Sequence, residues 1–257
     1  MPHILITNDD GVTAPGLHAL AQEIQKLDDV KITILAPDRN WSASGHVKTL
    51  HRPLRVKTVT LPGGITAYAS DGAPSDCVAL ALLGYTEELL DLVISGINPY
   101  SNIGHDVTYS GTVTAAMEAV IGGVPGMAVS LDSPEHVSGE TDYGPAARVA
   151  RKIAARVLHE GLPKNTLLNI NVPFLPESEI KGLQITRQGL RVYHDLLDRR
   201  TDPRGRPYFW IGGDTPTGVP DGGTDFGALA QGYVSITPLQ LDLTDYRTLA
   251  KLRGWED

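Results

Sequence analysis

The chain has 257 residues, of which 41% are hydrophobic and 20% charged, and its formal net charge at pH 7 is −8. These values are typical of one large globular domain with a substantial core, and the acidic balance excludes the basic surface that binding to duplex nucleic acid or an anionic membrane requires. The one cysteine, Cys77, lies in an apolar run without a disulfide partner, so we expect a buried core thiol.

No apolar run in the sequence has the length of a membrane span. The first predicted strand begins almost at Met1, which leaves no room for a signal peptide. We therefore predict a cytoplasmic protein. A small anionic substrate could still bind locally, through a metal ion and backbone N–H groups.

The N-terminal segment predicts a buried strand, an acidic turn and a helix in direct succession. Residues 4–6 are apolar, and the turn that follows carries Asp9 and Asp10. Ligands bind at the carboxyl ends of strands in open α/β sheets, so this pair lies where such sheets do chemistry. Adjacent carboxylates repel each other unless they share a proton or a hard cation such as Mg²⁺ or Mn²⁺. A turn that caps the helix is the alternative interpretation.

The following segments continue an alternation of strands and helices. Residues 30–36 predict a second strand, and residues 38–46 form a polar loop of small residues, which suits the lining of a site or simply a long connection. Residues 47–69 predict short strands or a hairpin. A helix begins at Pro74 and stops at Gly84.

Further strands are expected at residues 91–96, 125–131 and 167–172, with an amphipathic helix ending at Gly161. An Ala-rich helix begins near Ser110, where Ser110 or Thr112 could cap it, and Gly111 leaves its first N–H groups open to an anion. This order of elements predicts an α/β fold with a doubly wound, mostly parallel sheet.

After Pro173 the pattern changes to strands at residues 183–186, 208–211 and 232–237, separated by turn-rich segments. A protruding hairpin with so little core needs another surface to pack on, which predicts a β-rich arm used in oligomerisation. We therefore divide the chain into an α/β core over residues 1–173, which carries the site, and residues 174–257. The second part holds the hairpin arm, a return strand and a terminal helix packed on the core.

Four polar features are expected at one edge of this sheet: residues 8–10, 42–46, 98–102 and 110–112. Their carboxylates, amide carbonyls and hydroxyls make an all-oxygen site, which suits Mg²⁺ or Mn²⁺ and does not suit structural zinc. An open helix N-terminus beside a metal ion is a phosphate site in physical terms.

Ordered motifs along essentially the whole chain resemble the stationary-phase survival protein SurE family of metal-dependent 5′/3′-nucleotidases. The matching motifs are Thr7-Asn8-Asp9-Asp10-Gly11, Ala36-Pro37-Asp38, Ser42-Ala43-Ser44-Gly45-His46, Gly72-Ala73-Pro74-Ser75-Asp76-Cys77-Val78, Ser95-Gly96-Ile97-Asn98, Tyr109-Ser110-Gly111-Thr112-Val113, Gly223-Thr224-Asp225 and Gly232-Tyr233-Val234-Ser235-Ile236-Thr237-Pro238-Leu239. One departure is Pro99-Tyr100, where the family usually has Arg-Gly, and this leaves the substrate contacts of that loop open.

The resemblance implies a Rossmann-like core with a C-terminal arm exchanged between the subunits of dimers or tetramers. It implies hydrolysis of nucleoside 5′- and 3′-monophosphates, with some activity on short polyphosphate. It also implies one divalent cation per subunit, Mg²⁺ or Mn²⁺, held by four residues of this sequence: Asp9, Asp10, Ser42 and Asn98.

The mechanism we expect gives each remaining site residue a role. Asp9 orients the attacking water, and Asn8 and Asn102 hydrogen-bond the phosphate. Backbone N–H groups near Gly111 and Thr112 stabilise the phosphoryl charge, and the other expected phosphate-binding residues are Ser44, Gly45 and Ser110. His46 is a candidate general acid, with a structural loop histidine as the alternative.

Three rival functions remain open, and a fourth fails. A dinucleotide-binding dehydrogenase fails because the first turn carries Asp-Asp-Gly and no G-x-G-x-x-G. A phosphatase that works through a phospho-aspartate is harder to exclude, since an Asp after the first strand is a suitable nucleophile. A metal-dependent glycosyltransferase lacks a sugar-nucleotide signal. A metal- and nucleotide-binding regulator would bind AMP without releasing phosphate.

Overall fold

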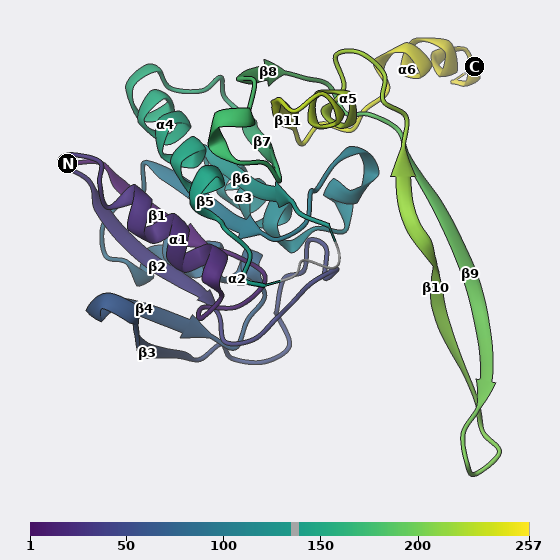
Figure 1. Cartoon of the computed structure of the whole chain (residues 1–257), viewed down its shortest axis with the longest axis horizontal. Coiled ribbons are helices and arrows are strands. Elements are labelled where there is room, and N and C mark those ends of the chain that lie inside the picture. The colour runs from purple at the N-terminus through teal and green to yellow at the C-terminus, as the bar shows by residue number, and fades with distance from the viewer. Residues whose placement is uncertain (135–138, 257) are drawn as a thin grey trace.

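The computed structural model describes residues 1–134 and 139–256, with the side chains of 214–216 excepted. The strands in the described residues form one nine-stranded sheet and a separate two-stranded hairpin (Figure 1). The sheet order is β3-β4-β2-β1-β5-β6-β7-β11-β8. Its centre consists of five parallel strands: β1 (His3–Thr7), β2 (Lys31–Pro37), β5 (Leu92–Asn98), β6 (Gly126–Asp132) and β7 (Thr166–Pro173). The predicted doubly wound, mostly parallel α/β fold is confirmed.

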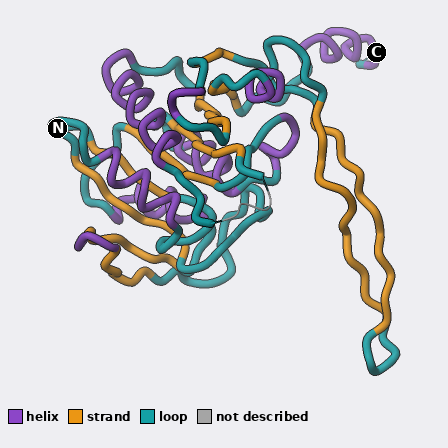
Figure 2. The backbone as a smooth tube through the Cα atoms, in the orientation of Figure 1, coloured by secondary structure: helices purple, strands orange, loops and turns teal. Residues whose placement is uncertain are grey.

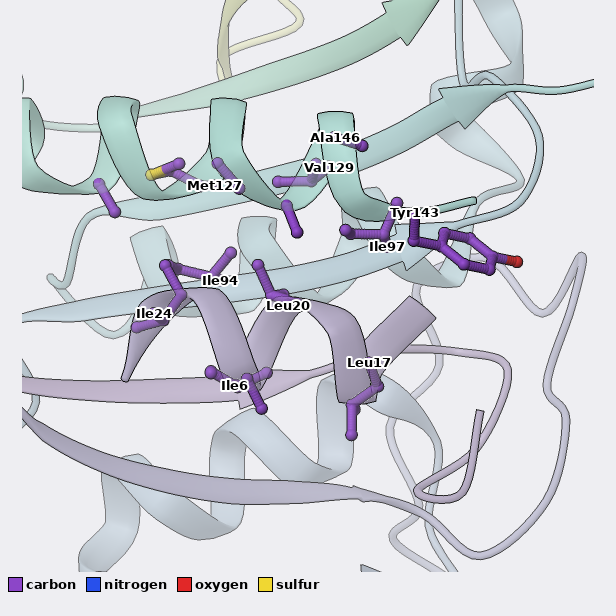
Figure 3. Close-up of a cluster of buried hydrophobic side chains, with 14 of the residues drawn as sticks. Ile6, Leu17, Leu20, Ile24, Ile94, Ile97, Met127, Val129, Tyr143 and Ala146 are labelled. Carbon is purple, nitrogen blue, oxygen red and sulfur yellow. The ribbon is translucent and has the colours of Figure 1, made fainter. Parts of the chain in front are cut away.

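Helices cover both faces of the sheet. On one face, α1 (Pro15–Ile24) and α4 (Gly144–Glu160) pack on the apolar side chains of β1, β5 and β6, as Figure 3 shows. On the other, α2 (Pro74–Leu80) and α3 (Gly111–Ile121) enclose a second cluster that includes the predicted buried thiol of Cys77. Among the described helices none is long and apolar enough to cross a membrane.

Helix α1 lies unusually close to the end of β5. A Cβ atom placed on Gly16 would come within 2.1 Å of the carbonyl oxygen of Ile97. Such a contact is impossible without moving the backbone, so the glycine sets how closely α1 can approach the strand that ends at Asn98. The carboxyl-terminal end of the sheet, which carries the predicted site, is therefore closely packed against a helix.

Both edges of the sheet are completed by strands of mixed direction. β3 (Val56–Leu61) and β4 (Ile65–Ser70) form the predicted antiparallel hairpin beside β2. At the opposite edge, β11 (Val234–Gln240) pairs antiparallel with β7, and β8 (Leu183–Ile185) pairs with β11. The predicted core boundary at residue 173 therefore falls inside the sheet, because β8 and β11 extend the core beyond it.

The hairpin of β9 (Arg191–Thr201) and β10 (Pro207–Gly218) leaves the core as a long, separate arm (Figure 2). The sequence patterns indicated β10 but not the strand β9, nor the short helix α5 (Asp225–Ala230). The terminal helix α6 (Tyr246–Leu252) is present, but it buries no residue in the single chain. The prediction that this helix packs on the core is therefore wrong for the isolated chain.

Candidate metal and phosphate site

The predicted site residues follow strands that are neighbours in the sheet. β1 lies between β2 and β5, which is where the chain order of the strands reverses direction. Asp9 and Asp10 follow β1, the loop with Ser42 follows β2, and Asn98 is the last residue of β5. Since all three strands run parallel, their carboxyl ends lie at the same end of the sheet, which is the usual location of ligands in such sheets.

The carboxylate of Asp9 is buried and held by Thr112, at the start of α3. The backbone N–H of Thr112 donates to Oδ2 of Asp9 at 3.1 Å, and its hydroxyl donates to Oδ1 at 2.5 Å. Burial raises the pKa of Asp9, while these donors and the N–H of Gly111 oppose the rise. The N-terminus of α3 thus stabilises the carboxylate of Asp9, which is the partner of the Thr112 N–H in the described chain, and the predicted role of Thr112 toward phosphate stays a prediction.

Gly111 makes this contact possible. A Cβ atom at this position would lie 2.7 Å from Cβ of Asp9 and 3.0 Å from its Oδ2. Any side chain would push the carboxylate away from the helix, so the glycine is required for close approach. Ser110, the residue before it, caps α3 by accepting a hydrogen bond from the N–H of Val113 at 3.1 Å. Ser110 is one of the two predicted capping residues.

Asp10 carries the second carboxylate, and burial together with the charge of Asp9 raises its pKa to about 7. Asn40 donates to its Oδ1 across 3.4 Å. In the described parts of the chain, no Lys, Arg or His forms an ion pair with Asp9 or Asp10. Two adjacent, partly buried carboxylates without a cationic side chain fit a metal cation.

The loop after β2 is attached to the acidic turn by its backbone. Trp41 N–H donates to the carbonyl of Asp9 at 2.7 Å, and Ser42 N–H donates to Oδ1 of Asn40 at 2.7 Å. Ser42 therefore directly follows a residue that contacts the backbone of Asp9. Ser44 has a buried Oγ with no hydrogen-bond partner among the described residues, which fits its predicted contact with phosphate.

Gly45, an expected phosphate-binding residue, has both backbone polar groups hydrogen-bonded within the protein. It donates to the carbonyl of Tyr109 at 2.9 Å, and the carbonyl of Gly45 accepts from the Thr114 hydroxyl at 3.1 Å. Gly45 thus fastens its loop to α3, and its N–H is not free for phosphate.

Asn8 and Asn102 also serve the scaffold. Asn8 is fully buried and its amide closes the acidic turn, with Nδ2 donating to the carbonyl of Gly11 at 3.0 Å and Oδ1 accepting from its N–H at 3.2 Å. Nδ2 of Asn102 donates to Ser130 at 2.9 Å, and its backbone binds Asn171. Both amides therefore position loops, and the phosphate contacts of these two residues stay predictions.

Asn98 lies at the end of β5, where its Nδ2 donates to the carbonyl of Tyr100 at 2.6 Å. Because Nδ2 is engaged within the loop, the amide oxygen is the atom left to coordinate a cation. His46, the predicted general acid, has Nε2 2.9 Å from Oε2 of Glu118.

The donor set decides which metal fits. In residues 1–134 and 139–256 no group of three His, Cys, Asp or Glu side chains could hold a metal ion. A cation at this edge would therefore combine two carboxylates with neutral oxygens of Ser42 and Asn98. Such a set suits Mg²⁺ or Mn²⁺ and lacks the nitrogen and sulfur ligands of structural zinc.

Three acidic residues to which the sequence analysis gave no role connect loops near the site to other parts of the chain. Glu118 lies in the middle of an Ala-rich helix, where nothing in the sequence marks it. Asp106 binds the hydroxyl of Tyr193 at 2.6 Å and Arg191 at 3.0 Å, both from the base of the arm. Buried Asp225 accepts from the N–H groups of Gly104 and Gly189.

Together, the reversal point of a doubly wound sheet and a paired carboxylate at the N-terminus of a helix define an α/β protein with a candidate site for a hard cation. Comparison with known proteins gives the family. The chain matches the family described as "Survival protein SurE" over residues 4–195, and it belongs to that family.

Relatives and a solved structure share the whole architecture. The chain is 47% identical over 254 residues to "5'-nucleotidase SurE" of Chloroflexus aggregans, covering 99% of each chain. It is 50% identical over 250 residues to the protein of the same name from Herpetosiphon aurantiacus, covering 97% of this chain and 96% of that one. The crystal structure of the SurE protein from Aquifex aeolicus superposes with a TM-score of 0.82 at 39% identity and covers 100% of both chains. The resemblance inferred from the motifs is thus confirmed.

Proposed function

We propose that this protein is a metal-dependent nucleotidase that hydrolyses nucleoside 5′-monophosphates to nucleoside and phosphate. The observation that carries the proposal is the Asp9–Asp10 pair, in which one carboxylate is fixed by Thr112 and neither has a cationic side-chain partner in the described chain. The curated names of full-length relatives support the reaction class. Hydrolysis of 3′-monophosphates and short polyphosphate belongs to the same proposal.

The proposed metal ligands are Asp9, Asp10, Ser42 and Asn98, which hold one Mg²⁺ or Mn²⁺ per subunit. A bound divalent cation supplies charge stabilisation at the phosphoryl oxygens and lowers the pKa of a water molecule. Thr112 keeps the carboxylate of Asp9 in one orientation, so that Asp9 can orient the attacking water. The unpartnered hydroxyl of Ser44 is the proposed donor to the phosphate.

Attack by water is favoured over a phospho-aspartate intermediate. Both oxygens of Asp9 accept hydrogen bonds from Thr112, and the side chain is buried, which makes it a poor nucleophile. A phosphoenzyme trapped by acid quenching during turnover would contradict this assignment. Its absence, with phosphate released in the same reaction, is the expected result.

We also propose that the arm of β9 and β10 pairs with a second copy of the chain in a dimer or tetramer. Its exposed apolar residues support this: Leu196, Leu197, Phe209, Trp210 and Ile211. A hairpin without a core of its own needs a second surface. The cytoplasmic location inferred from the sequence stays a prediction.

The test of the proposed function is phosphate release from 5′-AMP and 3′-AMP with EDTA, Mg²⁺ or Mn²⁺, for the wild type and Asp10→Asn. We expect metal-dependent release that falls by at least about a hundredfold in Asp10→Asn, since removal of a ligand costs no less than removal of a supporting group. Asp28→Asn, an exposed carboxylate near the end of α1, is the matched control and should retain full activity. Release that survives EDTA would overturn the metal mechanism.

A second readout comes from the same variants without metal. Replacing Asp10 by Asn removes the repulsion between two buried neighbouring carboxylates, so the metal-free variant should unfold at a higher temperature than the metal-free wild type. Added Mn²⁺ should stabilise the wild type and not the variant. A wild type that binds Mn²⁺ and AMP but releases no phosphate would instead support the regulatory binding protein.

A further inference from the structure

Glu118 connects the middle of α3 to the loop that carries Ser42. Its carboxylate oxygens lie 2.9 Å from Nε2 of His46 and 3.0 Å from Nζ of Lys48. The side chain of Glu118 is only 7% exposed, whereas those of His46 and Lys48 are 31% and 52% exposed. The carboxylate is therefore the fixed partner, and the loop is the part that it holds.

The burial of this carboxylate is costly unless both partners stay in place. A buried carboxylate that loses its partners is strongly destabilised, so the contact with the loop is enforced by desolvation rather than by surface attraction. Helix α3 is itself fixed, because Ala115 and Ala119 of the same helix are fully buried against the sheet. The position of Glu118 thus follows from the core.

Helix α3 holds both the loop and Asp9. Thr114 and Glu118 are four residues apart and share a face, on which Thr114 binds Gly45 and Glu118 binds His46. Thr112, at the start of the same helix, holds Asp9. A single rigid element therefore sets the distance between a carboxylate of the site and the loop that carries Ser42.

Ser42 lies between two attachments of its loop. On the N-terminal side, Trp41 N–H binds the carbonyl of Asp9 at 2.7 Å. On the C-terminal side, the nearest charged attachment is the group formed by Glu118, His46 and Lys48. Loss of the second attachment would leave this side of the loop with only the hydrogen bonds of Gly45 to Tyr109 and Thr114, and so loosen the backbone at Ser42 while the Asp9 end stayed in place.

We propose that Glu118 is a positioning residue that holds the Ser42 loop, through His46 and Lys48, in the geometry that binds the divalent cation. This rests on the proposed function, in which Ser42 is a metal ligand. It also reassigns His46 from proton donor to attachment point. The rise from Thr112 to Glu118 is about 9 Å along the helix, so the bond to Glu118 holds Nε2 of His46 near a part of α3 distant from the residue that binds Asp9.

The experiment compares wild type and Glu118→Gln by calorimetric titration of the metal-free protein with Mn²⁺. We expect a dissociation constant about 10- to 100-fold higher in the variant, the range for residues that support metal ligands. The matched control is Glu23→Gln, since Glu23 is a comparably buried helical carboxylate that pairs with Lys26 and Arg151, away from the site. This control should lose stability without losing metal affinity. His46→Gln and Lys48→Gln should each give a smaller loss of affinity than Glu118→Gln.

Turnover measurements separate the proposal from acid catalysis by His46. At low Mn²⁺, Glu118→Gln should lose the same fraction of its activity with 5′-AMP as with p-nitrophenyl phosphate. At saturating Mn²⁺ it should regain its activity with both substrates. A defect that persists at saturating metal and is larger for AMP, whose leaving group needs a proton, would assign His46 to acid catalysis and overturn the proposal. Unchanged Mn²⁺ affinity in Glu118→Gln would also overturn it.

The results that would overturn the proposed function differ from those that would overturn the role of Glu118. A wild type that binds Mn²⁺ but hydrolyses neither ester would end the nucleotidase proposal, while the change in affinity of Glu118→Gln would still decide the positioning role. A wild type that binds no Mn²⁺ would overturn both.

Discussion

The site at the carboxyl ends of the strands and the arm of β9 and β10 differ in how they are stabilised. At the site, buried polar groups are fixed by partners from the same chain, such as the two bonds from Thr112 to Asp9. In the arm, large apolar side chains such as Ile211 are exposed in the described chain, Ile211 to 83%. The single chain therefore specifies the geometry of its site, but it leaves the apolar surface of the arm exposed.

The largest expected effect comes from filling the space between α3 and Asp9. Gly111→Ala places a methyl group 2.7 Å from Cβ of Asp9, so the carboxylate or the helix must move. We expect phosphate release to fall about a hundredfold and the free energy of unfolding to fall by about 1–3 kcal/mol. Activity assays and chemical denaturation measure the two effects.

Gly222→Ala is the control, because a Cβ atom at that position meets nothing within 4 Å. It should leave both quantities unchanged. Activity within twofold of wild type in Gly111→Ala would show that the close packing of α3 on Asp9 does not matter for turnover.

A smaller effect is expected when one of the two bonds to Asp9 is removed. Thr112→Val keeps the shape of the side chain and the backbone N–H at 3.1 Å, but loses the hydroxyl donor at 2.5 Å. A hydrogen bond to a charged group contributes about 1.5–3 kcal/mol, so we expect at least about a tenfold fall in phosphate release. Thr112→Ser, which retains the hydroxyl, should recover most of the activity. Equal activities for all three proteins would remove Thr112 from the mechanism.

The smallest effect on turnover is expected for a change in the arm. Ile211 pairs with Leu197, and Phe209 pairs with Arg199 two positions along, so these residues share one face of the hairpin. Ile211→Glu puts a charge on the proposed interface and should reduce the mass measured by light scattering to that of a single chain. The activity per chain should change little, because the arm contributes none of the proposed ligands.

Arg156→Glu, at an exposed position of α4 outside the arm, is the control for Ile211→Glu and should leave the mass unchanged. A wild type that is already monomeric would contradict the proposed oligomer. A fall in mass for both variants would show that the effect of Ile211→Glu is not specific to the arm.

The parts of the fold that could be predicted are those buried within the chain. β1, β2, β5 and α1 follow from apolar runs and helical spacing, because the sheet and its covering helices bury these residues. β9 gave no such signal, since its residues are almost all exposed in the chain and no face is patterned by burial. The same reason applies to helix α6, all of whose residues are exposed in the chain.

The candidate site was predictable in position but not in the direction of its side chains. Strand order placed Asp9, Ser42 and Asn98 at one edge, and the sheet confirms that their strands are neighbours. The sequence cannot show that the amides of Asn8 and Asn102 turn toward their own loops, because an asparagine serves a turn and a phosphate equally well. Glu118 was missed because a helical glutamate is usually exposed.

The close approach of α1 to β5 has a consequence for how such a site can diverge. Gly16 lies so near the carbonyl of Ile97 that not even one methyl group can be added there. Mutations on that side of the site therefore break the scaffold before they can alter the choice of substrate. Variation has room instead two residues beyond Asn98, at Tyr100, which is 48% exposed. New nucleotide preferences would thus arise at the rim of the site, where a side chain can change without displacing α1 from β5.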